Sequence, residues 1–203
     1  MPRTGERGGP QTRARISQIA TGLFLERGFD AVTVAEVAKA AGVSSVTVFN
    51  HFPRKEDLLL DTEADAADLL RSAVRERAPG VDVVAALREM SFRLVDERHS
   101  LSGVKDDGTT VFYRTVAASP ALLARAREIA SELQHTLADE LARDENFVGD
   151  GPLLAAFFLA GYSTVLVETA RRLIAGVPLR DVSDDHRVRL ERMFDALRGG
   201  VTS

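Results

Sequence analysis

Hydrogen-bonding side chains gather in a short stretch that begins at Ser44. Ser44, Ser45 and Thr47 carry hydroxyl groups, and Asn50 carries an amide that both donates and accepts hydrogen bonds. Such groups pair with the donor and acceptor edges of bases in the major groove of DNA, and a small apolar side chain such as Val46 fits a thymine methyl group. These residue types favour nucleic-acid recognition if a helix presents them together.

Two short helices joined by a turn at glycine are predicted around these side chains. Thr33 followed by Glu36 is a capping box, which marks the start of a helix that stops at Gly42. Ser44 then caps a second helix that runs through Asn50. Two short helices in this order predict a helix-turn-helix, whose second helix lies in the major groove of DNA.

The charge of the chain is divided unevenly. The 203 residues carry a net charge of −4, but residues 1–55 carry +4 and the remainder carries −8. A basic end on an acidic body is expected where one end meets a polyanion. Of the 26 basic residues 23 are Arg, so a compositional preference for Arg is an alternative explanation for the charge.

The sequence of residues 12–60 closely resembles the DNA-binding domain of the TetR/AcrR family of bacterial transcriptional regulators. Three segments carry the resemblance: Ala20-x-x-Leu23-Phe24-x-x-x-Gly28-Phe29, Thr33-Val34-Ala35-Glu36-Val37-Ala38-Lys39-Ala40-Ala41-Gly42-Val43-Ser44 and Val48-Phe49-Asn50-His51-Phe52-Pro53-Arg54-Lys55-Glu56-Asp57-Leu58-Leu59. A match over three consecutive predicted helices is far more specific than a short motif. Beyond it, only the size and the helical texture of the chain agree with the family.

The resemblance implies how the head contacts DNA. With Ser44 at the start of the recognition helix, it implies base or backbone contacts from Ser45, Val46, Thr47, Phe49 and Asn50, and phosphate contacts from Thr33, His51 and Lys55. The family often has Tyr where this chain has Phe49, which cannot hydrogen-bond a phosphate; Phe49 then packs against a sugar or a thymine methyl group, or anchors the helix. His51 makes either a structural hydrogen bond at the helix end or a charge-dependent DNA contact.

Helical periodicity continues to the C-terminus, and no alternating strand pattern of convincing length interrupts it. We therefore expect an all-α protein of about nine helices, with a basic arm over residues 1–10, the helix-turn-helix domain over 11–54 and a helical ligand-binding and dimerisation domain over 55–203. The helices are expected over residues 12–27, 34–41, 45–50, 55–77, 82–97, 109–117, 120–144, 152–175 and 183–197.

The last two predicted helices resemble the dimerisation pair of the family. The stretch from Leu153 to Tyr162 is apolar all round at its start, too short to span a bilayer, and therefore expected to be deeply buried. Small residues on this helix would let another helix approach closely, although both helices could instead complete the core of their own subunit. The expected dimer contacts are Ala156, Ala160, Gly161, Thr164, Met193, Phe194 and Leu197.

The resemblance also implies a small effector bound in the body and coupled to the head through the long predicted helix over residues 55–77. Because effector and DNA binding would oppose each other, the implied mode is repression of a palindromic operator by a homodimer. Apolar side chains and two phenols make a partly apolar effector the expected class. Alternatively, each of the candidate effector contacts is a residue of the apolar core. These candidates are Phe92, Val95, Phe112, Tyr113, Val116, Phe158 and Tyr162.

Motifs of catalysis are missing from the sequence. The chain has no Cys and no HExxH, GxSxG or GxGxxG motif, and residues 103–110 approximate a phosphate loop without its Lys. We therefore expect that the protein is not an enzyme and that it binds no metal or cofactor. Without a secretory signal or an apolar run of 18 residues, a cytoplasmic protein with no membrane partner is expected. The alternative function is a helical small-molecule-binding or protein-interaction module whose head does not bind DNA.

Overall fold

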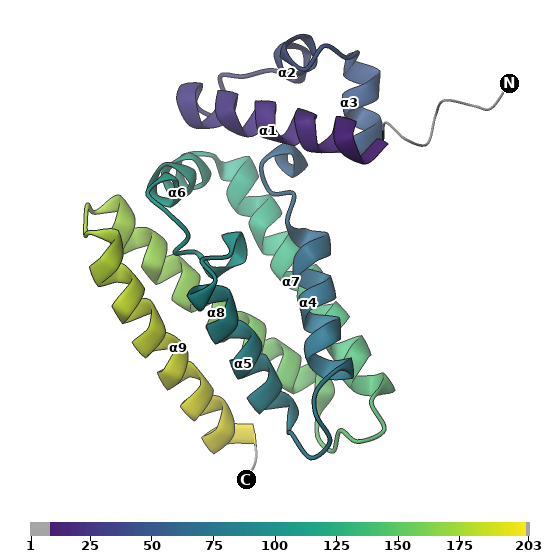
Figure 1. Cartoon of the computed structure of the whole chain (residues 1–203), viewed down its shortest axis with the longest axis vertical. Coiled ribbons are helices and arrows are strands. Elements are labelled where there is room, and N and C mark those ends of the chain that lie inside the picture. The colour runs from purple at the N-terminus through teal and green to yellow at the C-terminus, as the bar shows by residue number, and fades with distance from the viewer. Residues whose placement is uncertain (1–8, 202–203) are drawn as a thin grey trace, which may run out of the picture. The chain divides into compact units, whose positions relative to one another are not determined.

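The computed structural model describes residues 9–201, and the regular secondary structure of this part of the chain consists of helices joined by turns and loops, without a strand (Figure 1). The expected all-α fold with nine α-helices is thereby confirmed for these residues. The helices are α1 (Gly9–Arg27), α2 (Val34–Ala40), α3 (Ser45–His51), α4 (Glu63–Arg75), α5 (Val83–Asp96), α6 (Gly108–Ala118), α7 (Pro120–Arg143), α8 (Gly151–Ile174) and α9 (Leu179–Val201), with the short 3-10 helices η1 (Glu56–Leu58) and η2 (Ser100–Ser102).

The long helix expected over residues 55–77 is broken. The chain forms η1, leaves the helical path at Leu59 and resumes as α4 at Glu63. Leu58 and Leu59 are both buried, and Asp61 pairs with Arg13 of α1. These tertiary contacts hold the segment against the first helices and override its local helical preference.

The chain divides into two compact units, one comprising Met1–Asp61 with Thr115–Ala126 and the other Thr62–Arg114 with Arg127–Ser203. The first unit, here called the head, therefore extends beyond the expected boundary at residue 54 and includes the α6–α7 corner. Met1 to Gly8 of the expected arm lie outside the described residues, whereas Gly9 and Pro10 already belong to α1. Proline is accepted there because the first turn of a helix needs no amide donor.

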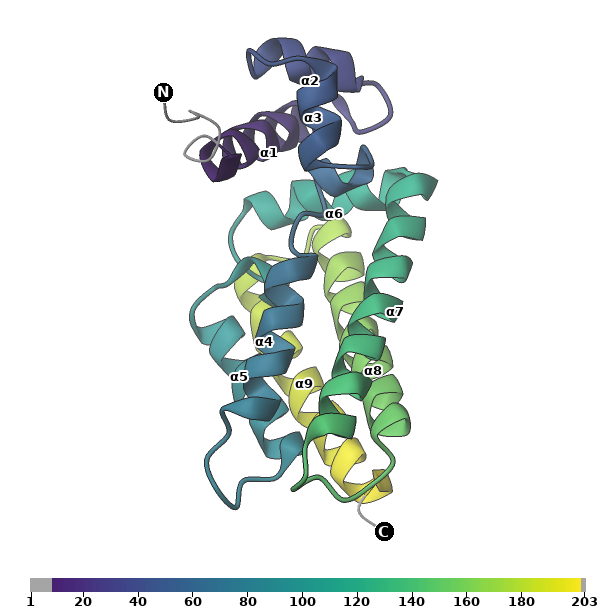
Figure 2. The same ribbon diagram turned by 90° about the vertical axis from the view of Figure 1, so that its right-hand side faces the viewer.

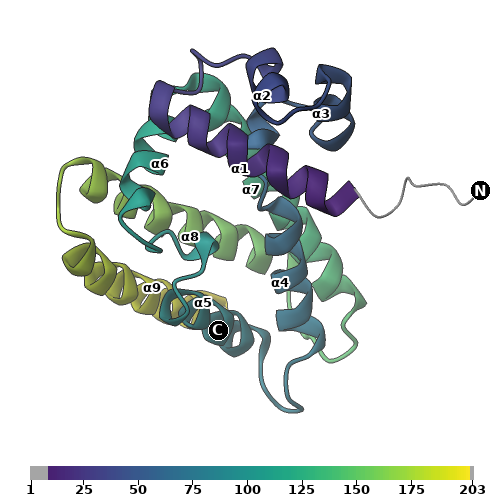
Figure 3. The ribbon, with the colours of Figure 1, turned by 45° about the horizontal axis from the view of Figure 1, so that its top comes forward.

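The head is built around one apolar face of α1. Ile16, Ala20 and Phe24 follow each other at intervals of one helical turn and are fully buried. Val48 and Phe52, from α3 and its C-terminal cap, are also buried, as is Leu122 at the start of α7. Figure 3 shows α1 with α2 and α3 of this unit. This packing fixes one side of α3 and leaves its opposite side on the surface.

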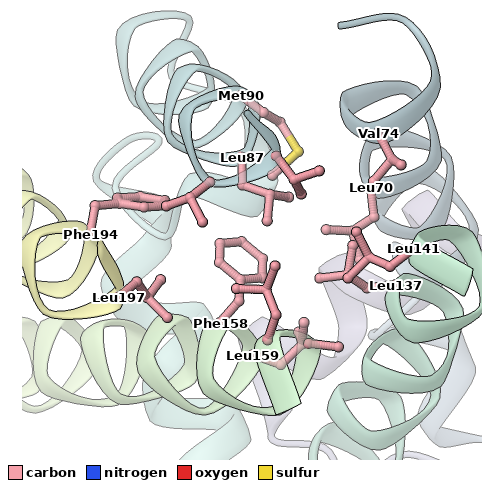
Figure 4. Close-up of a cluster of buried hydrophobic side chains, with 14 residues drawn as sticks. Leu70, Val74, Leu87, Met90, Leu137, Leu141, Phe158, Leu159, Phe194 and Leu197 are labelled. Carbon is pink, nitrogen blue, oxygen red and sulfur yellow. The ribbon is translucent and has the colours of Figure 1, made fainter. Parts of the chain in front are cut away.

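The second unit, here called the body, is a bundle of α4, α5, α8, α9 and most of α7 (Figure 2). Every one of these helices contributes to one apolar core, in which the side chains point toward one another (Figure 4). The core contains Leu70, Val74, Val83, Val84, Leu87, Met90, Leu137, Leu141, Leu154, Ala155, Phe158, Leu159, Phe194 and Leu197.

Helix α8 is longer than the apolar stretch that suggested it. By length and composition its residues, Gly151–Ile174, could cross a membrane, contrary to the expectation from Leu153–Tyr162 alone, although the core helix of a soluble bundle passes the same test. Leu154 and Phe158 lie in the core of the body, but Leu153 and Phe157 are exposed. The expected burial all round is therefore wrong, and α8 carries a second apolar face on the surface.

Candidate nucleic-acid interface

Local capping interactions define the two short helices of the head. The Thr33 hydroxyl accepts the amide of Glu36, and the Glu36 carboxylate accepts the Thr33 amide, which completes the expected capping box. The Thr33 amide, Arg27 and the Thr33 hydroxyl all donate hydrogen bonds to the Glu36 carboxylate, which lowers the pKa of Glu36 to about 2. Gly42 adopts a φ of +64° in the turn between the helices, a conformation that favours glycine. The turn therefore follows from residues that the sequence already identifies.

The exposed side of α3 carries the recognition candidates. Val46 is 68% exposed and Phe49 is 49% exposed, and Asn50 also lies on the surface. Because half of its surface is open to solvent, Phe49 is not a core anchor of the helix. Ser45 is half-buried at the start of α3. The structure therefore brings the expected base contacts to one accessible helix, held from behind by buried apolar residues.

The hydroxyl groups of Ser44 and Thr47 are engaged with each other. Ser44 caps α3 by accepting the Thr47 amide at 3.0 Å, and the two hydroxyl oxygens lie 2.9 Å apart. One hydroxyl proton is shared between them, so the pair as a whole can offer one more proton to a DNA base. The same two hydroxyl groups therefore serve both the helix cap and the expected base contact of Thr47.

Lys55 is held by the head itself. Its ammonium donates a hydrogen bond to the Phe29 carbonyl at 2.7 Å and lies 4.2 Å from the centre of the Phe29 ring. Lys55 also precedes the short helix η1, and the long helix expected to begin at this residue does not form. Two ammonium protons remain for a phosphate, but the first role of Lys55 in this structure is to link the end of α1 to the segment after α3.

Arg13 is a structural residue of the site whose role the local sequence does not reveal. Its guanidinium donates to the His51 carbonyl at 2.7 Å, stacks 4.2 Å from the centre of the Phe52 ring and pairs with Asp61. The hydrogen bond at the end of α3 therefore uses the backbone of His51. An Arg on the polar side of α1 gave no local signal of this contact.

The α6–α7 corner is attached to the helix-turn-helix within the head. The Ser119 hydroxyl donates to Asp30 at 3.1 Å, and Arg125 Nε donates to Asp57 at 2.8 Å. Ser119 lies between α6 and α7, and both helices continue from this corner into the body. The head thus contains its own attachment point for two helices of the body.

The expected dimer contacts divide into two groups. Phe194 and Leu197 are 1% and 6% exposed in the single chain and belong to the core of the body, so they cannot present an apolar surface to a second subunit. Gly161 faces Met193 of the same chain, where a Cβ atom would come within 2.9 Å of the Met193 sulfur. The remaining residues, Ala156, Ala160 and Thr164, are half-buried or exposed on α8.

The expected effector contacts are mostly core or half-buried residues. Phe158 and Tyr162 lie with ring centres 5.8 Å apart, and Phe92 packs against the same core. Burial raises the pKa of Tyr162 to about 12 and raises that of Tyr113 as well. Val95 is buried, and Phe112 and Tyr113 are half-buried on α6. Val116 is half-buried too but belongs to the head.

Two cavities of the body are lined by different residues. One of about 940 Å³ lies between segments 74–84 and 140–154. Arg75, Arg77 and Arg143 line it, each paired with a carboxylate. A groove of about 480 Å³ lies between α5 and α9. Of the seven expected effector contacts, Phe92 alone lines either of these two cavities.

Known proteins share both the head and the fold. Residues 16–62 match the family model described as bacterial regulatory proteins, tetR family. The HTH-type transcriptional regulator TcmR of Streptomyces glaucescens is 28% identical over 193 residues, 93% of this chain and 83% of TcmR. The HTH-type transcriptional repressor KstR2 of Rhodococcus jostii is 34% identical over 99 residues, which span about half of each protein, 47% and 48%.

A solved structure extends the likeness beyond the head. Thermus thermophilus FadR, a TetR-family transcriptional repressor in complex with lauroyl-CoA, has a TM-score of 0.56 and 26% identity over 91% of this chain and 92% of its own. A three-helix head of this kind with a larger helical body defines a helix-turn-helix regulator of transcription. Residues 16–62 therefore form a DNA-binding domain of the tetR family of bacterial regulatory proteins, and the chain as a whole is similar to TetR-family regulators of transcription.

Proposed function

We propose that the protein is a cytoplasmic, sequence-specific repressor that binds an inverted-repeat operator as a homodimer and is released by a partly apolar small molecule. The observation that carries the proposal is the exposed side of α3, which presents Val46, Phe49 and Asn50 while Val48 and Phe52 are buried behind it. Asn50 and Ser45 supply hydrogen bonds to base edges. Thr33, His51 and Lys55 remain the proposed phosphate contacts.

The homodimer is proposed to form through the exposed apolar face of α8. Leu153, Phe157 and Val167 are exposed, and Ala160 and Thr164 lie between them at helical spacing. A row of apolar and small side chains at intervals of three and four residues is the pattern of a helix–helix contact. A two-fold axis through this face would pair each α8 with its copy, and place two heads to read two half-sites.

Effector release is proposed to act through the α6–α7 corner. Because the helical path between α3 and α4 is broken, a single rigid helix does not connect the recognition helix to the body. The corner instead belongs to the head, and its two helices continue into the body. The aromatic cluster of Phe92, Phe158 and Tyr162 supports a partly apolar effector, as does the lauroyl-CoA bound by Thermus thermophilus FadR.

Selection of bound sequences from a random pool of duplex DNA tests the proposal without a guessed operator or effector. At near-physiological salt we expect the purified protein to enrich an inverted repeat. The affinity for that repeat should fall steeply as salt rises, because phosphate contacts release counterions. If nothing is enriched by the protein, even after denaturation and refolding to remove a bound effector, the alternative of an interaction module that does not bind DNA is supported.

Asn50→Ala provides the matched loss-of-function variant. Asn50 is exposed, so its replacement should leave the fold intact and weaken binding to the selected operator by about 10-fold, the range of one good base contact. Asn146→Ala, on an exposed loop of the body, is the control and should bind as the unchanged protein does. Equal affinity of all three proteins would contradict the assignment of Asn50.

A further inference from the structure

The recognition helix exposes two large apolar side chains. Val46 and Phe49 are 68% and 49% exposed, whereas the next apolar residues, Val48 and Phe52, are each 1% exposed. The head therefore buries the neighbouring apolar side chains in its core, yet it leaves these two in solvent. Exposed apolar side chains on a surface that meets a partner mark contacts made on binding.

The two side chains share one face of α3. Residues three apart on a helix are neighbours, and they are separated by about 4.5 Å along its axis. Successive base pairs of DNA are about 3.4 Å apart. A helix lying in the major groove can therefore set Val46 and Phe49 against groups on neighbouring base pairs. The apolar group that the major groove offers is the 5-methyl group of thymine.

The hydroxyl groups of two residues close to Val46 are already engaged in the helix cap. The hydroxyls of Ser44 and Thr47 are 2.9 Å apart and engaged in the cap of α3. Phe49 has no polar atom in its side chain, so it cannot read a base edge by hydrogen bonding. Apolar contact is the recognition chemistry left to both residues.

We propose that Val46 and Phe49 read thymine methyl groups on neighbouring base pairs of each operator half-site. This inference rests on the proposed function, because it requires that α3 enters the major groove. It adds a requirement that hydrogen-bond readout does not make: the operator must carry 5-methyl pyrimidines at two defined positions. Each of these side-chain contacts then depends on the methyl group of the base and not on its hydrogen-bonding groups.

Single thymine-to-uracil replacements in the selected operator test the proposal. Uracil keeps every hydrogen-bonding group of thymine and removes only the methyl group. We expect replacement at two positions of each half-site to weaken binding about fourfold per position, as for the loss of one buried methyl group. Fluorescence anisotropy with labelled duplexes measures the change.

Variants assign each methyl group to a side chain. Val46→Ala and Phe49→Ala should each bind the thymine operator more weakly and become insensitive to uracil at one position, while remaining sensitive at the other. Val148→Ala, which truncates a valine that is 96% exposed in the body, is the matched control and should retain both sensitivities. Variants that lose affinity yet keep full sensitivity at both positions would overturn the assignment.

Failure of this inference can be distinguished from failure of the proposed function. An enriched operator that tolerates uracil at every position would overturn methyl readout and leave sequence-specific DNA binding standing. A selection that enriches no sequence from the refolded protein would overturn both.

Discussion

Arg125 and Asp57 form an ion pair across 68 residues of sequence. The Arg125 Nε donates to the Asp57 carboxylate at 2.8 Å, and the side chains are 11% and 18% exposed. Asp57 lies in η1, between α3 and the break in the chain, and Arg125 lies in the second turn of α7. With the Ser119–Asp30 bond, this pair holds the α6–α7 corner to the helix-turn-helix.

Removal of the Arg125–Asp57 ion pair should destabilise the head. Arg125→Gln leaves the Asp57 carboxylate largely buried without its cationic partner, which should lower the free energy of unfolding by about 1–3 kcal/mol. Urea denaturation followed by circular dichroism measures the loss. Arg180→Gln removes the exposed Arg180–Asp181 pair and should change stability by less than about 0.5 kcal/mol. Equal effects of the two variants would show that the corner is not held by Arg125.

His186 should make the stability of the body depend on pH. Its side chain is 1% exposed, and burial together with Arg187 lowers its pKa from 6.5 to about 4. Thr169 donates its hydroxyl proton to the Val165 carbonyl and therefore accepts the proton on His186 Nδ1, which leaves Nε2 as a buried acceptor without a partner among the described residues.

Between pH about 6.5 and 4 the unfolded chain binds a proton at His186 that the folded chain does not, so stability falls as the pH falls through this window. The contribution is about 1.4 kcal/mol per pH unit. His186→Asn keeps a donor toward Thr169 but does not titrate. The urea midpoint of this variant should therefore depend less on pH between pH 6.5 and 5. The exposed His135→Asn is the control and should keep the full dependence. If the urea midpoint of the His186 variant still falls with pH as in the unchanged protein, the pH dependence of stability arises from other groups.

A charge on the exposed face of α8 should prevent dimer formation. Phe157 is 48% exposed in the single chain, so Phe157→Asp should yield a folded monomer, because an aspartate buried in the dimer interface would lack a partner. Sedimentation velocity measures the assembly state. Val148→Asp adds the same charge at a fully exposed loop and should remain dimeric. A dimeric Phe157 variant would place the interface elsewhere.

Lys55 should stabilise the head even without DNA. Lys55→Met keeps the aliphatic stem but removes the hydrogen bond to Phe29 and the contact with its ring, which should cost about 1–2 kcal/mol of unfolding free energy. Lys39→Met, at an exposed position of α2, serves as the control. Unchanged stability, with a salt dependence of DNA binding reduced by about one phosphate contact, would instead identify Lys55 as a phosphate ligand only.

The sequence by itself determined the features that depend on neighbours along the chain. The Thr33–Glu36 capping box, the left-handed glycine at Gly42 and the Ser44 cap are interactions within a few residues, so their residue types predict the helix-turn-helix. The helical period likewise predicts nearly every helix of the body, since each must bury one apolar stripe.

Only the tertiary structure decided which residues each side chain contacts and which side chains are buried. The break after η1 depends on buried Leu58 and Leu59 and on Arg13 pairing with Asp61, contacts that local propensity does not contain. Periodicity marks Phe157 and Phe194 equally as apolar, yet one lies on the surface and the other in the core. Which stripe of an apolar helix is buried is set by the direction from which other helices approach, and that direction is fixed only when the whole body packs.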